Sequence, residues 1–147
     1  MTGIIQTVFA GIQAITILIA FLAYRAAVGQ ITPVLSINCT QDLMSVSVSN
    51  GGLGPAFIRK ISFKRWTGGD HKTVDRLVPI ANDVECSRRA GDWATVLPAK
   101  DSVQLVCFAN RDNIVYQWGF LNEAIVVIDF DDARGVARHF EGTILQP

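Results

Sequence analysis

The sequence contains few of the residues from which metal sites and nucleophilic catalysts are usually built. Among 147 residues there are three cysteines and two histidines, and they show neither C-x-x-C nor H-x₃-H spacing, so a zinc site is not expected. No glycine-rich loop ending in Lys-Ser or Lys-Thr opens a helix, so a common phosphate-binding loop is excluded. Basic and acidic side chains number 13 each, whereas a nucleic-acid binder usually carries a basic excess. We therefore expect no cofactor, no metal and no nucleic-acid partner.

Charge is missing from one long stretch of the chain, because the first charged side chain is that of Arg25. Of the 21 residues from Ile4 to Tyr24, 16 are apolar, and at about 1.5 Å per residue a helix of this length matches the roughly 30 Å hydrocarbon core of a bilayer. A cleaved signal peptide would need a basic segment before a shorter apolar run. The sequence therefore predicts a retained transmembrane helix over residues 1–25, a connector over 26–32 and a domain over 33–147.

Two features bear on the orientation of this helix. Arg25 follows the apolar run directly and no lysine or arginine precedes the run, so the positive-inside rule places the domain in the cytoplasm. Three cysteines cannot all pair within the chain, which suits a reducing compartment. A bridge between Cys39 and Cys107 would instead fit a periplasmic domain, and the sequence leaves this alternative open. We expect a single-pass protein of the bacterial inner membrane with a cytoplasmic domain.

One face of the expected helix carries polar and small residues, which recur at steps of three and four. Glutamine side chains can hydrogen-bond between helices in lipid, and Gln13 lies near the middle of the apolar run, where an unsatisfied amide is costly. A plain anchor with a few scattered small residues is the alternative. We expect a helix-contact face that meets transmembrane helices of other subunits or of a second copy of the chain. This face consists of Thr2, Gln6, Gln13, Thr16 and Ala20.

The remainder of the chain is dominated by patterns typical of β-strands. Leu43 to Ser49 alternates apolar and small polar residues, and Ala56 to Trp66 places Ile61 and Phe63 on one face. Turn residues interrupt the pattern every 8–12 residues, which favours an antiparallel sandwich or barrel. Further strands are expected over 34–39, 71–78, 93–97, 102–109, 124–128 and 136–145, a polar loop over 82–89 and a short helix within 110–122.

Two turns carry a resemblance to a known family. The segments from Val46 to Ile58 (VSVSNGGLGPAFI) and from Val96 to Leu105 (VLPAKDSVQL) resemble the strand–turn motifs of immunoglobulin-like sandwiches of the CARDB-like kind. The chain is similar to small, uncharacterised bacterial single-pass membrane proteins that carry such a sandwich behind one helix. It differs in having Lys100 where glycine is usual, and extra residues over 81–93 and 110–122. The resemblance implies an immunoglobulin-like β-sandwich with an adhesive or scaffolding function, and no chemistry.

One acidic cluster is a weak candidate for a metal site. Asp129, Asp131 and Asp132 lie close together, with Glu141 predicted on the returning strand, and calcium is bound by several carboxylates on a tight loop. The same residues followed by Gly135 also suit a solvated hairpin turn. We favour the turn.

Two other local features have alternative interpretations. Cys86 precedes Arg88 and Arg89, whose charges would favour a reactive thiolate, but no histidine base is adjacent. Lys60, Lys64 and Arg65 with Trp66 form a basic stretch that would protect an exposed strand edge. A nucleotide or anionic-lipid contact there is the alternative.

The sequence thus predicts a mainly β protein: an N-terminal transmembrane helix followed by an antiparallel immunoglobulin-like β-sandwich. The expected function is that of a non-enzymatic accessory or scaffolding subunit of a larger membrane complex, since no catalytic constellation is found. The alternative is a self-oligomerising membrane sensor or effector of the bacterial defence type, in which the sandwich binds a small signal. An enzyme acting close to lipid is disfavoured for lack of an active-site motif.

Overall fold

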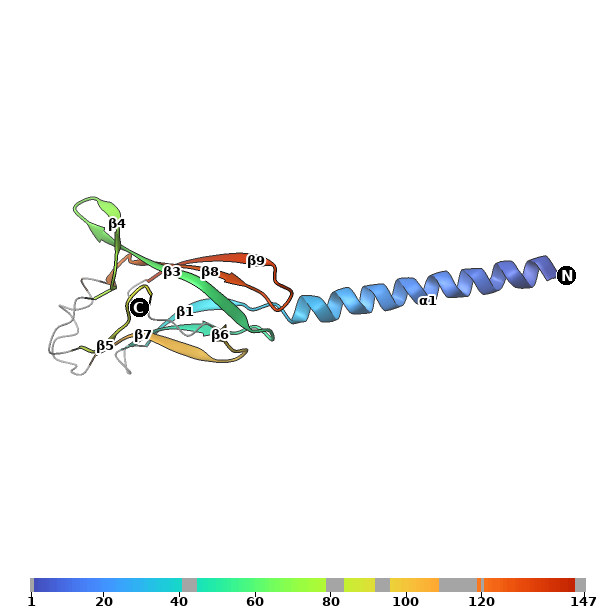
Figure 1. Cartoon of the computed structure of the whole chain (residues 1–147), viewed down its shortest axis with the longest axis horizontal. Helices are drawn as coiled ribbons and strands as arrows, with labels where there is room; N and C mark the ends of the chain where they lie inside the picture. Colours follow the sequence, from blue (N-terminus) through green and yellow to red (C-terminus); the bar gives the residue numbers. More distant parts are fainter. Residues whose placement is uncertain are drawn as a thin grey trace. The chain divides into compact units, whose positions relative to one another are not determined.

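The computed structural model describes residues 2–40, 45–78, 84–91, 96–108, 119 and 121–144. The chain divides into two compact units, Met1–Ile31 and Thr32–Pro147. The first unit consists of helix α1, Thr2–Gln30 (Figure 1). Within α1, the segment Ala10–Val28 is long and apolar enough to cross a membrane, and none of it is buried by the rest of the chain. The prediction of an apolar N-terminal helix is confirmed.

Helix α1 continues further than the sequence suggested. Residues 26–30, expected as part of a connector, extend the helix to Gln30. Ala26 and Ala27 have high helix propensity and no proline interrupts the chain before Pro33, so nothing ends the helix at Arg25. The amide of Ile31 donates to the carbonyl of Val28 at 3.2 Å as the helix ends. Residues 26–30 of the predicted connector are therefore helical, and the helix leads almost directly into the second unit.

The second unit, hereafter the β domain, contains two antiparallel sheets (Figure 1). Sheet A has the strand order β1-β2-β7-β5; its strands are β1 (Leu35–Thr40), β2 (Ser45–Asn50), β7 (Ser102–Phe108) and β5 (Val84–Ser87). Sheet B has the order β4-β3-β8-β9; its strands are β4 (Asp70–Val74), β3 (Ala56–Thr67), β8 (Ile125–Asp131) and β9 (Ala137–Thr143). The short strand β6 (Val96–Leu97) pairs with the start of β3.

A single hydrophobic core takes side chains from both sheets. Val46 and Val106 contribute from sheet A, and Phe63, Val126 and Ile128 contribute from sheet B; all five are fully buried. Alternate residues of each strand supply this core, as the period-two pattern predicted. The mainly β, antiparallel character of the domain is confirmed.

One strand of the β domain lies where the sequence predicted a loop. The segment 82–89 was expected to be a polar loop, but Val84–Ser87 forms strand β5 against β7. The alternation in Val84–Ser87 covers only four residues and lies in an otherwise polar stretch, so the pattern did not distinguish this strand from a loop. The helix expected within 110–122 falls largely on residues outside those described.

Three turns lie at the end of the domain where the chain enters it, which we call the entry end. The β2–β3 turn reaches back to the entering segment, because the amide of Gly51 donates to the carbonyl of Val34 at 2.8 Å. The β6–β7 turn is joined to it by a bond from the amide of Lys100 to the carbonyl of Asn50 at 2.9 Å. The β8–β9 turn follows Asp131, which lies opposite Phe57 at the start of β3 (Figure 1).

Candidate functional site

The predicted helix-contact face is described in part. All side chains from 10 to 27 are exposed, including those of Gln13, Thr16 and Ala20; the side chains of Thr2 and Gln6 lie outside those described. The hydroxyl of Thr16 donates to the carbonyl of Ile12 at 2.9 Å, so its polar group is satisfied within the helix. Gln13 is thus the clearest unsatisfied polar group on the described part of this face.

Arg25 marks the end of the uncharged stretch in a way suited to a membrane surface. Its guanidinium carbon lies 5.7 Å from the centroid of the Phe21 ring, one turn earlier. The cation therefore stacks along the helix over an aromatic side chain, which is a favourable arrangement where apolar and polar surroundings meet.

A polar groove of about 860 Å³ lies along sheet A. Ser47 and Ser49 of β2 form its floor, with Asn38 of β1 on one side and Gln104 of β7 on the other; Lys100 lies at the entry end. The small serine side chains between longer neighbours make this face of the sheet concave. The sequence identified the alternation of β2 but not the groove, since this depends on the pairing of three strands.

Hydrogen-bonding capacity in the polar groove is only partly used. The hydroxyls of Ser36 and Ser49 lie 3.3 Å apart, and the amide of Asn38 also donates to Ser49. Among the described residues, the hydroxyl of Ser47 and the side-chain amide of Gln104 have no hydrogen-bond partner. The groove can therefore offer neutral donors and acceptors to a polar molecule, with the oppositely charged Lys100 and Asp101 both at its entry end.

Asn50 organises the entry end of the domain. Its buried side-chain oxygen accepts bonds from the amides of Val34 and Gly52, each at 3.1 Å. Its side-chain nitrogen donates to the carbonyls of Gly54 at 2.8 Å, Pro98 at 3.1 Å and Leu97 at 3.3 Å. One amide thus connects the entering segment with two turns, a role that the sequence did not reveal beyond its turn composition.

Gly52 fits against the entering segment so closely that no side chain could be added. A Cβ atom at this position would lie 2.2 Å from the carbonyl oxygen of Thr32 and 2.6 Å from the amide nitrogen of Val34. Both atoms belong to the backbone and cannot move away as a flexible side chain would. Gly52 is therefore required for the close approach of the β2–β3 turn to the entering chain.

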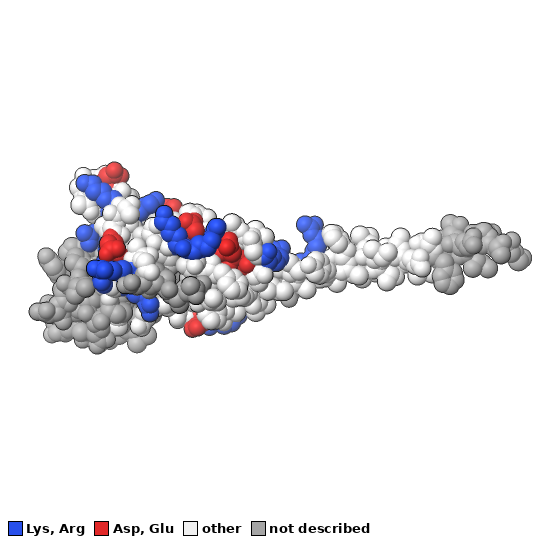
Figure 2. All heavy atoms as spheres, viewed as in Figure 1, with Lys and Arg blue, Asp and Glu red and all other residues white. Residues whose placement is uncertain are grey.

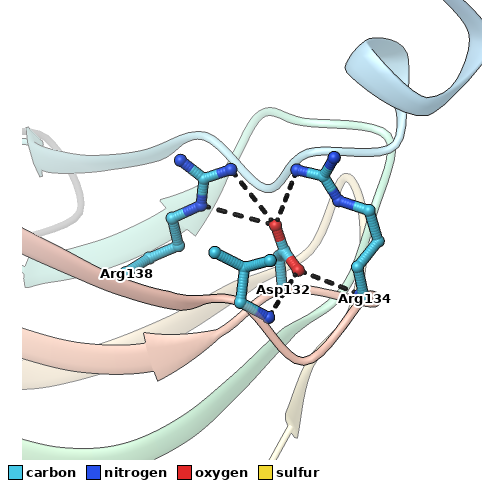
Figure 3. Close-up of polar contacts among 4 residues, drawn as sticks. Asp132, Arg134 and Arg138 are labelled. Atoms are coloured by element: carbon cyan, nitrogen blue, oxygen red, sulfur yellow. Dashed lines mark hydrogen bonds and ion pairs between the residues drawn. The ribbon is translucent and has the colours of Figure 1, made fainter. Parts of the chain in front are cut away.

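The acidic cluster does not converge on a common point. Asp132, in the β8–β9 turn, is almost fully buried and accepts bonds from the amides of Arg134 at 2.9 Å and Val136 at 3.0 Å. Its other oxygen lies 3.1 Å from the guanidinium of Arg134 and 3.2 Å from that of Arg138 (Figure 3). Burial alone would raise the pKa of Asp132, but these backbone and guanidinium bonds outweigh it and lower the pKa to about 2.

The neighbouring aspartates face outward from sheet B and have different partners. Asp131 pairs with Arg59 at 3.3 Å, and Asp129 lies 2.7 Å from Nδ1 of His139. The hydrogen bond from His139 lowers the pKa of Asp129. The described residues hold no group of three side chains placed to bind a metal ion, and the local structure follows the hairpin interpretation. Figure 2 shows basic and acidic side chains interspersed over the β domain.

The basic stretch of β3 is only partly at a sheet edge. Lys64 is paired on both sides, with Thr73 of β4 and Ile125 of β8, so the expected edge-protecting role is wrong for this residue. Lys60 pairs with Asp129 of β8 and lies between the segments of β3 that pair with β6 and β4. Arg65 donates to the carbonyl of Leu77 at 3.5 Å, and Trp66 packs edge-on against His71, with ring centroids 4.9 Å apart. The stretch therefore forms part of a hairpin and not a continuous cationic patch.

The cysteines are distributed over three strands of sheet A. β2 lies between β1, which carries Cys39, and β7, which carries Cys107; two strand spacings are about 9–10 Å, beyond the reach of a disulfide. The alternative of a Cys39–Cys107 bridge is thus wrong, and burial raises the pKa of Cys39. The register instead places Cys86 of β5 opposite Cys107. The side chain of Cys86 lies outside those described.

No family model, curated protein or solved structure matches the chain.

Proposed function

We propose that the protein is a single-pass membrane protein whose β domain is an immunoglobulin-like sandwich, and that it acts by binding, as an accessory or scaffolding subunit of a larger membrane complex. The observation that carries the proposal is the exposure of α1: all side chains from 10 to 27 are exposed, and Gln13 lies among them. A helix of this composition requires an apolar cover, and the described residues bury none of its segment Ala10–Val28.

The sandwich is supported by the shared core of the two sheets. Antiparallel sheets with alternating inward residues are the general construction of immunoglobulin-like domains. Sheets A and B both contribute fully buried valines to one hydrophobic cluster. The turns that carry the resemblance, 50–55 and 98–101, are held together by Asn50.

The case for a helix partner depends on the amide of Gln13. Lipid covers apolar side chains well, but it offers no hydrogen bond to an amide within the hydrocarbon region. Among the described residues no partner for this amide is found. A second transmembrane helix, with its own polar side chain or backbone carbonyl, would satisfy it.

A cytoplasmic β domain is supported by Arg25, the only basic residue near either end of the candidate span Ala10–Val28. Fusions of a fluorescent protein and of alkaline phosphatase after Pro147 test this orientation in a bacterium. Fluorescence without phosphatase activity is expected. The reverse pattern would place the domain in the periplasm.

The helix-contact face is tested by removing both glutamines. Replacing Gln6 and Gln13 with leucine should preserve membrane insertion, since leucine is more favourable in lipid. We expect helix association to weaken by about 1–3 kcal/mol, a roughly tenfold to hundredfold change. Energy transfer between labelled copies in vesicles measures self-association, and recovery of a co-extracted subunit measures association with another protein.

The matched control changes the other side of the same helix. Replacing Ile12 and Ile19 with leucine alters two apolar residues off the contact face and should leave association unchanged. Equal losses from both pairs, or no loss from either, would mean that α1 is only an anchor and that any partner is held by the β domain.

The alternative function, a self-oligomerising sensor or effector, is favoured by the polar groove. An open groove of about 860 Å³ with free neutral hydrogen-bonding groups is large enough for a small polar signal. The size of the detergent-extracted protein separates the two functions. A stoichiometric complex with a different protein supports the subunit, whereas a homo-oligomer supports the effector.

A further inference from the structure

The exposed apolar side chains of the β domain are concentrated at the entry end. Among the described residues of this domain, six large hydrophobic side chains are exposed. Five of them form what we call the entry rim; these are Val34, Leu53, Phe57, Val96 and Val136. The sixth, Trp66, lies near the opposite end, in the hairpin of β3 and β4.

Each member of the entry rim is placed there by backbone contacts. Val34 is in the entering segment, and Leu53 is in the turn whose Gly52 touches that segment. Phe57 lies opposite both Val96 and Asp131, so it brings β6 and the end of β8 to the same place. Val136 completes the rim, since its amide donates to Asp132 within the β8–β9 turn, directly after Asp131. Residues from four separate segments thus share one end.

The short link between α1 and the β domain limits how far the entry end can lie from the membrane. The candidate membrane span ends at Val28, and the β domain begins at Thr32. Four residues extend at most about 14 Å, and two of these four, 29 and 30, are still helical. The headgroup layer on each side of a bilayer is about 5–7 Å thick. Whatever the orientation of the domain, its entry end stays within reach of that layer.

We propose that the entry rim is a membrane-contacting surface that inserts its apolar side chains into the headgroup–acyl boundary of the bilayer that α1 crosses. The inference rests on the proposed single-pass anchor. Leu53 and Val136 are 57% and 45% exposed, and apolar side chains on turns gain free energy by entering this boundary. Contact with lipid would limit the orientations of the domain and present the polar groove in a defined direction.

The charges around the entry rim are compatible with a lipid surface and do not require anionic lipid. Arg134 and Arg138 share one carboxylate, that of Asp132, which leaves a single net positive charge in this turn. Arg59 is balanced by Asp131. Guanidinium groups beside apolar side chains can reach lipid phosphates, as arginine does at membrane interfaces. The apolar side chains therefore carry the contact, and it should form on phosphatidylcholine as well as on anionic lipid.

The experiment places tryptophan on the rim of the full chain in vesicles. Leu53→Trp and Val136→Trp are compared with Thr73→Trp, an exposed position in the distant hairpin. Each variant is reconstituted in phosphatidylcholine with and without bromine at carbons 6 and 7 of one acyl chain. Bromine quenches tryptophan at this depth, so the emission added by the two rim substitutions should fall by about half, in keeping with insertion to 5–10 Å. The emission added at position 73 should not change.

Three results would overturn the proposal: no quenching of either rim tryptophan, equal quenching of all three, or a blue-shifted rim emission that neither bromine nor aqueous acrylamide quenches. The last pattern would mean that a protein partner or a second copy covers the rim. Alkaline extraction of the same vesicles tests the anchor separately. A chain that resists extraction while its rim is not quenched would retain the proposed function and lose only this inference.

Discussion

Helix α1 and the β domain distribute the same kinds of side chain in opposite ways. In α1, Ile17 and Ile19 are 69% and 61% exposed, whereas in the β domain Phe63, Val126 and Ile128 are fully buried. Both arrangements are consistent with the hydrophobic effect. The apolar side chains of the β domain are covered by the domain itself, whereas those of α1 must be covered by lipid or by other helices. The stability of the β domain should thus depend on its own contacts. The insertion and association of α1 should depend on lipid and neighbouring helices.

The strongest test of this difference is to remove the amide that organises the entry end. Replacing Asn50 with alanine leaves several buried backbone groups without partners, and we expect the free energy of unfolding of the β domain to fall by about 3 kcal/mol. Membrane extraction of the full chain should not change. Chemical denaturation followed by tryptophan fluorescence measures the free energy of unfolding. Alkaline extraction measures whether the full chain stays in the membrane.

The matched control for this test is Asn38→Ala, which removes an exposed amide of the same type from the polar groove. Its effect on unfolding should stay within about 0.5 kcal/mol. If the Asn50→Ala variant is as stable as Asn38→Ala, the bonds of Asn50 at the entry end do not contribute to the stability of the β domain.

A smaller loss is expected at the close contact between the β2–β3 turn and the entering chain. In Gly52→Ala the new Cβ meets backbone atoms of Thr32 and Val34, and displacing them should cost about 2 kcal/mol of stability. In Gly51→Ala the nearest atom lies 3.8 Å away, so this neighbour should tolerate the change within about 0.5 kcal/mol. Equal melting temperatures of the two variants would contradict the tight contact.

A pH-dependent effect is expected from Asp132→Asn, which keeps the shape but removes the charge. Because the folded pKa of Asp132, about 2, is below its ordinary value of 3.8, the ionised carboxylate stabilises the fold at pH above about 4. This contribution is lost as the pH falls toward 2. Denaturation midpoints at pH 7, 4 and 2.5 should therefore converge for the variant and the parent chain. A constant difference across this range would show that the charge is not the cause.

The sequence predicted the features that repeat along the chain. The uncharged stretch predicted α1, and the alternation in β3 placed Ile61 and Phe63 inside. Strand β5 was missed because its alternation covers only the four residues Val84–Ser87 within a polar stretch. The length of α1 was underestimated because Arg25 was taken as its end, although arginine is compatible with a helix.

The sequence predicted less about individual sites. Residues 131–135 form a hairpin turn, as the sequence predicted. The sequence of this turn does not indicate that Asp132 is buried, because its ion pair with Arg138 comes from the returning strand. The polar groove needs three strands in register, and the role of Asn50 needs turns 47 and 48 residues away. Such contacts between distant segments leave no periodic signal in one sequence.

The most direct test of the account is alkaline extraction of bacterial membranes that contain either the full chain or residues 32–147 alone. We expect the full chain to remain in the membrane pellet and the shorter chain to appear in the supernatant as a folded β domain with a cooperative melting transition. Release of the full chain would contradict a membrane-spanning α1. A shorter chain that fails to melt cooperatively would contradict the self-sufficiency of the β domain.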